Sequence, residues 1–122
     1  MAATIQIIRT RRMKAQGGVC FYCGFPVWTG DPSDYIRQTG LTRKQAERFR
    51  CTAEHLTARC DGGTDAEENI VAACHFCNQT RHATTTPMPA DKYREKVRCR
   101  LARGKWHMAA LRCAGRLRRP TS

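Results

Sequence analysis

Four of the eight cysteines form two matched pairs, Cys20 with Cys23 and Cys74 with Cys77, and each pair is separated by two residues. A Cys-x2-Cys turn can point both sulfurs at one ion, and two such turns supply the four thiolates of a closed tetrahedral site. Zinc is the usual occupant of such a site, although iron takes the same ligands. Two disulfides or two redox-active pairs are the alternative interpretation. We predict that these cysteines hold a structural zinc ion.

A second group of chemically capable residues begins with Glu54 and His55, which are adjacent near the end of a stretch that alternates enough for a strand. A neutral imidazole can take a proton from a water molecule that attacks phosphorus, and a carboxylate is a suitable ligand for Mg²⁺ or Mn²⁺. Neighbours on a strand point to opposite faces, so both side chains serve one site only at a twist, a bulge or the strand's end. Asn78 and His82 are four residues apart in an expected helix, and one helical face therefore presents both to a metal ion.

Together these positions resemble the HNH endonuclease motif, also called the ββα-metal motif, over about residues 19–83. The resemblance rests first on the acid–histidine pair and on Gly62 and Gly63, which follow the histidine after seven and eight residues. It rests further on Asn69, fourteen residues after the histidine, and on the second cysteine pair, which is followed at once by Asn78. So many independent positions at the right spacing make the resemblance specific.

The resemblance implies a function and a role for each residue. His55 would be the general base, and Glu54, Asn78 and His82 would bind a divalent metal such as Mg²⁺ or Mn²⁺. Asn69 would brace the loop or orient the histidine, and is counted with His55 among the catalytic residues. The reaction would be hydrolysis of DNA phosphodiester bonds, leaving a 5′-phosphate and a 3′-hydroxyl; nothing in the sequence separates DNA from RNA as the substrate.

The sequence departs from the family pattern at two of these positions, and other interpretations stay open. The first ligand is Glu where Asp is commoner, and Asn78 stands where many members have His. Asn69 is also a good turn residue, and His82 also suits a helix end. The rival function is a non-catalytic, zinc-dependent nucleic-acid-binding module on the same scaffold. Such a module would not need His55, and the presence of this histidine favours the enzyme.

The charge distribution favours a polyanionic partner. The formal net charge is +12, and it is uneven: residues 1–50 carry +6, residues 51–90 carry −3 and residues 91–122 carry +9. A slightly acidic centre between two basic arms is typical of a metal-holding core with phosphate-binding surfaces beside it. No apolar stretch is long enough for a membrane span, and no secretory signal opens the chain. We therefore expect an intracellular, cytoplasmic protein of bacterial or phage origin that binds DNA.

We predict a single α+β domain over residues 1–122, with a zinc-stapled ββα core at about 18–86, flanking N- and C-terminal helices and a basic helical extension at about 89–119. The elements that must position the site are, in chain order, a helix at 9–16, two short strands within 19–28, a helix at 42–50, strands at 51–56 and 69–74, a helix starting at 78, a helix at 90–103 and a second apolar stripe over 106–117. Residues 4–8 fit a strand or a helix start, 84–89 reads as a linker, and the chain end from 116 is expected to fray.

Overall fold

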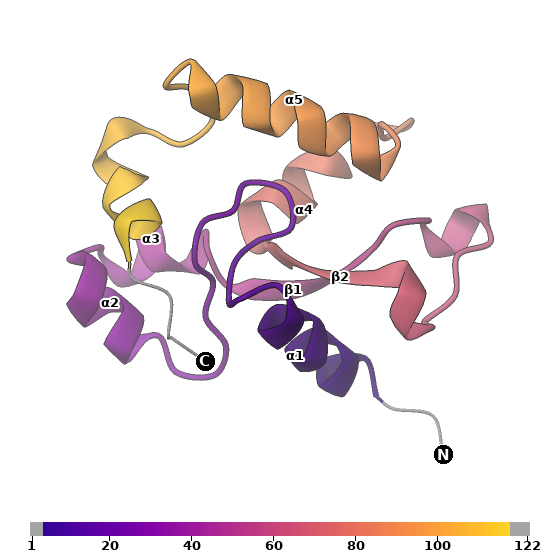
Figure 1. The fold of residues 1–122 in the computed structure, drawn as a ribbon, viewed down its shortest axis with the longest axis horizontal. Coiled ribbons are helices and arrows are strands. Elements are labelled where there is room, and N and C mark those ends of the chain that lie inside the picture. Colours follow the sequence, from indigo (N-terminus) through magenta and orange to yellow (C-terminus); the bar gives the residue numbers. More distant parts are fainter. Residues whose placement is uncertain (1–3, 118–122) are drawn as a thin grey trace.

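The centre of the computed structural model, which describes residues 4–117, is a two-stranded antiparallel sheet (Figure 1). Strands β1 (Cys51–His55) and β2 (Ile70–Cys74) pair in register, so that Cys51 lies opposite Cys74 and His55 lies opposite Ile70. Helix α1 (Ile5–Ala15) packs against one face of this sheet and helix α4 (His75–Arg81) against the other. Because both faces are covered, every residue of β2 is buried. The predicted α+β fold with a ββα core is confirmed.

The helices that precede the sheet begin at clear sequence signals. The Thr4 hydroxyl accepts a hydrogen bond from the Ile7 amide and opens α1, so residues 4–8 are a helix start and not a strand. The predicted capping box at Thr42 and Gln45 is present and opens α3 (Arg43–Glu47), which ends three residues earlier than expected. A further helix, α2 (Ser33–Thr39), was not predicted, because its seven residues are too short for a recognisable apolar period.

The first cysteine turn differs from the prediction. We expected two short strands within residues 19–28, but the structure has only isolated bridges there, between Val19 and Pro26 and between Trp28 and Arg50. The turn is so tight that the Gly24 amide already donates to the Cys20 carbonyl, which leaves no room for a longer ladder. Helix α4 begins at His75, three residues before the expected position, because the Cys74 sulfur accepts from the Cys77 amide and acts as its N-cap.

The C-terminal segment packs on the core. Helix α5 (Ala90–Ala102) buries Tyr93 and Val97, the apolar face that the sequence predicts. The predicted apolar stripe over 106–117, which included Ala109 and Ala110, is only partly buried. Its helix, η3 (Ala109–Arg116), is a 3-10 helix that buries Leu111 and Ala114 and leaves Ala109 and Ala110 exposed. The expected fraying concerns mainly residues 118–122, which lie outside the described residues. None of the helices within residues 4–117 has the length and apolar character of a membrane span.

Candidate functional site

The four predicted cysteines converge in the core. Their sulfurs all lie within 4.8 Å of one another, and all four residues are buried. The Cys23 and Cys74 sulfurs are 4.0 Å apart, close to the separation of about 3.8 Å that a tetrahedral zinc site with bonds of about 2.3 Å requires. Backbone amides donate to the sulfurs of Cys20 and Cys74, and the Trp106 indole donates to that of Cys77, as suits thiolates. The donor set fits a structural zinc ion.

A second metal site at the cysteines that flank His55 is not formed in the part of the chain that the structure describes. The four-cysteine cluster is the one converging group of Cys, His, Asp and Glu ligand atoms found over residues 4–117. Cys51 is buried, and burial raises the pKa of its thiol to about 11, whereas Cys60 is exposed. Cys51 therefore behaves as a small apolar core residue.

Glu54 is a buried carboxylate on the α4 side of β1, with only 2% of its surface exposed. One of its oxygens, Oε2, accepts from the Tyr22 hydroxyl at 3.1 Å and from Arg81 at 3.2 Å. The other, Oε1, lies 2.9 Å from Nε2 of His82, whose side chain is 32% exposed. The Arg81 charge compensates the carboxylate, and the His82 side is the one that opens toward solvent.

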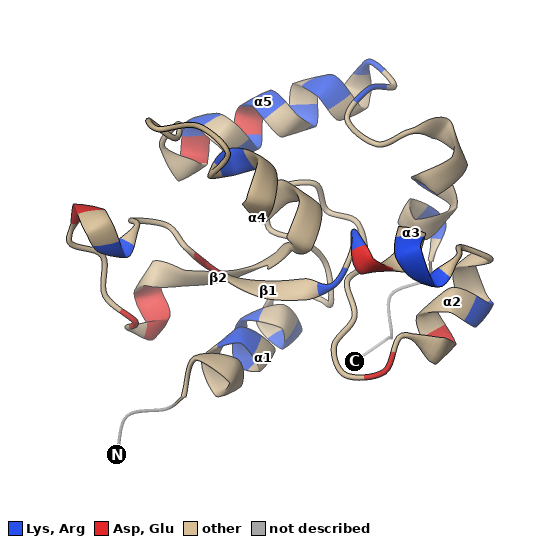
Figure 2. Ribbon diagram, turned by 180° about the vertical axis from the view of Figure 1, so that it is seen from behind, with Lys and Arg blue, Asp and Glu red and all other residues tan. Residues whose placement is uncertain are grey.

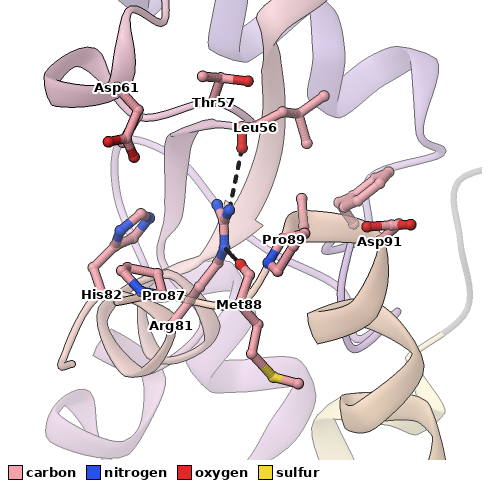
Figure 3. A pocket seen from close by; sticks show the side chains of 12 residues that line it. Leu56, Thr57, Asp61, Arg81, His82, Pro87, Met88, Pro89 and Asp91 are labelled. Atoms are coloured by element: carbon pink, nitrogen blue, oxygen red, sulfur yellow. Dashed lines mark hydrogen bonds between the residues drawn. The ribbon is translucent and has the colours of Figure 1, made fainter. Parts of the chain in front are cut away.

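Arg81 connects three elements around this carboxylate. Besides Glu54 and Tyr22, its guanidinium donates to the backbone carbonyl of His55 and to those of Leu56 and Met88, the last two of which Figure 3 shows. It thereby ties the end of β1 to α4 and to the linker before α5. Sequence reasoning missed Arg81 and Tyr22. Arg81 lies between Asn78 and His82, and Tyr22 lies inside the first cysteine pair. These positions give only a weak signal of a functional role, because surface arginines and core tyrosines are common in any small domain.

Asn78 and His82 contact the same face of β1 at different residues. The Asn78 amide donates to the Thr52 hydroxyl at 3.0 Å, and Thr52 is two residues from Glu54, hence on the same face of the strand. The structure thus pairs Glu54 directly with His82, and places Asn78 one step away along β1. Of these two residues, only His82 contacts the Glu54 carboxylate.

His55 is the last residue of β1, the strand-end position that the sequence argument required if it is to share a site with Glu54. Its Nε2 lies 2.8 Å from Oδ1 of Asp65, and its side chain is 17% exposed, so the ring is not turned into the core. Arg59 donates to both oxygens of Asp65, at 3.0 and 3.1 Å. Hydrogen bonds from His55 first and Arg59 second hold the pKa of Asp65 below its ordinary value. Asp65 was not predicted, although it is an acid in the loop that follows His55.

Asn69 closes that loop by three side-chain hydrogen bonds. Its Oδ1 accepts from the Thr57 amide, and its Nδ2 donates to the carbonyls of Thr57 and Thr64. The loop also requires glycine at two positions. Gly62 has a φ of +89°, and a Cβ on Gly63 would lie 1.8 Å from the Thr57 oxygen. These contacts support the bracing role that the resemblance implied for Asn69.

A hollow of about 520 Å³ opens beside His82, between the end of β1, the end of α4 and the start of α5. Figure 3 shows His82 and Asp61 on one side of it and Pro89 and Asp91 on the other. His55 is not among the lining residues, so its ring reaches solvent next to the hollow and not inside it.

Comparison with known proteins agrees with this geometry. The model of the HNH endonuclease family matches residues 42–84, the segment that carries β1, the glycine loop, β2 and α4. Residues 42–84 therefore match the HNH endonuclease family, whose members are typically nucleases. The comparisons with curated proteins and with solved structures give no match.

Proposed function

We propose that this protein is a metal-dependent endonuclease that hydrolyses phosphodiester bonds of DNA. The observation that carries the proposal is the arrangement at the end of β1. A partly exposed imidazole is held by Asp65, and the adjacent residue is a buried carboxylate paired with His82, the residue that follows α4. The family match over these residues supports the same conclusion.

His55 is the general base in this proposal. If Nε2 carries the proton that it donates to Asp65, the ring's Nδ1 has a free lone pair, and within residues 4–117 no group hydrogen-bonds to it. That nitrogen takes a proton from a water molecule as the water attacks phosphorus. Asp65, which Arg59 holds in place, fixes the orientation of the His55 ring. Asn69 fixes the conformation of the loop that carries Asp65.

Glu54, His82 and Asn78 would hold a divalent cation such as Mg²⁺ or Mn²⁺. When bound, such a cation stabilises the negative charge that develops on the phosphoryl group and on the leaving 3′-oxygen. The donor set of oxygen and imidazole nitrogen suits these ions, and Oε1 of Glu54 already lies beside Nε2 of His82. Arg81 and Tyr22 occupy the other oxygen and keep the carboxylate in place. A zinc ion at the four cysteines would hold the first cysteine turn against α4.

The DNA backbone would lie along α5. Basic residues occur along the length of this helix (Figure 2). The start of the same helix lines the hollow beside His82. Lysine and arginine at this density neutralise phosphates and release counterions, which gives salt-dependent binding. The basic residues free to meet phosphates are Lys92, Lys96 and Arg100 of α5 and Arg103 directly after it. Arg94 and Arg98 face the first cysteine turn, where Arg94 lies over the Phe21 ring and Arg98 donates to the Tyr22 carbonyl.

One observation favours the rival function, a zinc-dependent nucleic-acid-binding module without activity. Both oxygens of Glu54 have partners within the protein, Arg81 and Tyr22 on one and His82 on the other, so the carboxylate is not a free ligand. A cation would have to displace the His82 contact from Oε1. Cleavage and binding assays on the same protein separate the two functions.

The test is metal-dependent nicking of supercoiled plasmid. The zinc-loaded protein is incubated with Mg²⁺, Mn²⁺ or Ni²⁺ and with chelator, alongside His55→Ala and a control, His75→Gln, whose ring contacts Arg50 and not the site. The proposal expects nicking by the wild type and the control, and none by His55→Ala or with chelator. Equal nicking by His55→Ala would indicate another site or a contaminant. Binding without nicking under every metal would establish the rival function.

A further inference from the structure

A second hollow lies at the opposite end of β1 from His55. It has a volume of about 290 Å³ and is bounded by α1, by the loop that follows the first cysteine turn, by α3 and by the first residues of β1. Four residue steps along β1 separate Cys51 in its wall from His55, a span of about 13 Å. Arg9 enters it from α1, the helix on the side of the sheet away from α4. The hollow is therefore separate from the candidate active site.

Three guanidinium groups line this hollow, those of Arg9, Arg43 and Arg50. One carboxylate, that of Glu47, accompanies them, and it accepts from Arg50 at 2.5 Å. Arg50 also contacts the ring of His75, so its charge is paired with Glu47 and two of its donors are engaged. After this pairing, two positive charges remain at the hollow without an acidic partner in its wall. Figure 2 shows basic residues on α1 and on α3, two of the elements that bound the hollow.

The remaining two arginines lack hydrogen-bond partners among residues 4–117. The Nε atom of Arg9 is buried and makes no hydrogen bond, which is costly for a charged donor. Arg43 makes none either, and the nearby Asp31 already accepts from the amide and the hydroxyl of Ser33. Two unused guanidinium groups that face one small hollow are suited to an oxyanion that accepts from both, and phosphate, like carboxylate, matches the planar fork of arginine donors. The formal net charge of +12 favours the phosphates of a nucleic acid as the partner.

We infer that this hollow binds a phosphate group of the nucleic-acid backbone, at a position outside the bond that is cut. The inference takes from the proposed function only that nucleic acid is the partner. Arg9 and Arg43 supply the hydrogen bonds and Arg50 adds charge. The contact holds the nucleic acid at the end of β1 away from His55, and it carries no base preference, because phosphate contacts position a protein without reading sequence.

The test measures duplex binding against salt, with His55→Ala as the background so that nothing is cut. Arg43→Gln is compared with Arg37→Gln, which removes the same charge from α2, outside the hollow. Loss of one phosphate contact lowers the slope of log Kd against log salt by about 0.9, equivalent to about 3.5-fold between 50 and 200 mM salt. We expect this change in Arg43→Gln, no change in Arg37→Gln, and recovery in Arg43→Lys.

A local readout identifies the ligand. The Nε–H resonance of ¹⁵N-labelled Arg9 is followed during titration with the duplex, with inorganic phosphate and with polyglutamate. A shift with the duplex, together with the slope change, supports the inference. A shift with inorganic phosphate but not with duplex would show a free-anion site, and one with polyglutamate alone a protein partner; either overturns the inference, as does an unchanged slope.

The two proposals fail in different ways. If the wild type never nicks plasmid, the endonuclease is refuted while the salt slope still tests the hollow. If the wild type nicks plasmid and Arg43→Gln binds with an unchanged slope, the endonuclease stands and the phosphate contact is refuted.

Discussion

Arg81 offers a test of whether the buried charges around Glu54 are as tightly coupled as their geometry indicates. Replacement of Arg81 by Met keeps much of the side-chain volume but removes the cation and its hydrogen bonds to Glu54, Tyr22 and three backbone carbonyls. Both ion-pair members are almost fully buried, with side chains 5% and 2% exposed. Removing one member of a buried pair costs about 3–5 kcal/mol, because the other charge stays buried without compensation.

The magnitude is large compared with the total stability of a small domain, about 5–15 kcal/mol. We expect urea unfolding of the zinc-loaded protein, followed by circular dichroism, to show a free energy of unfolding lower by about 3–5 kcal/mol in Arg81→Met. The exposed Arg37, which is paired with Asp34, is the control, and Arg37→Met should cost less than about 1 kcal/mol.

A double-mutant cycle isolates the pair. In a Glu54→Gln background no carboxylate is left unpaired, so Arg81→Met should cost at least about 2 kcal/mol less than it does in the wild type. Equal costs in the two backgrounds, or a cost in the wild type no greater than that of the control, would refute the coupling between Arg81 and Glu54.

Three further predictions concern the zinc cluster, the loop and a buried histidine. Cys20→Ser should lower the zinc content and abolish folded structure in circular dichroism, since the cluster lies in the core; unchanged zinc content would contradict a zinc site there. Asn69→Ala removes three hydrogen bonds from the loop at Thr57 and Thr64, so trypsin should cut after the exposed Arg59 several-fold faster, and an unchanged cutting rate would show that Asn69 does not brace the loop. Burial first, and the neighbouring Arg48 second, lower the pKa of His107 to about 4. In the unfolded chain the pKa is about 6.5, so the unfolded chain binds more protons than the folded protein between pH 4 and pH 6.5. Stability should be highest above pH 6.5 and fall by about 3 kcal/mol on acidification to pH 4, and His107→Phe should flatten that part of the urea-derived profile; parallel profiles would contradict it.

Sequence reasoning predicted the elements whose signals are local and strong. The capping box at Thr42, the strand pair around the glycine loop and the apolar face of α5 at Tyr93 and Val97 are all present. It missed α2 and the 3-10 geometry of η3, because short helices are stabilised by packing and not by an apolar period in their own residues.

For the candidate site, too, local signals were predicted and contacts between distant segments were missed. Motif spacing pointed to Glu54 and His82, whose side chains are in contact, and the close approach of Gly63 to Thr57 explains one of the motif's glycines. The residues that hold the site in place were not identified. Arg81 and Asp65 act through contacts between segments 27 and 10 residues apart, and such contacts leave no periodic trace in the sequence.

The most direct measurement of the central claim is the single-turnover rate of cleavage of a labelled DNA duplex by wild type and by His55→Ala, both zinc-loaded, in Mn²⁺. A general base contributes about 10²- to 10⁴-fold to rate, so the variant should be slower by at least about 100-fold while it binds the duplex with unchanged affinity. A variant that cleaves within twofold of the wild type would show that the imidazole at the end of β1 does not perform the chemistry.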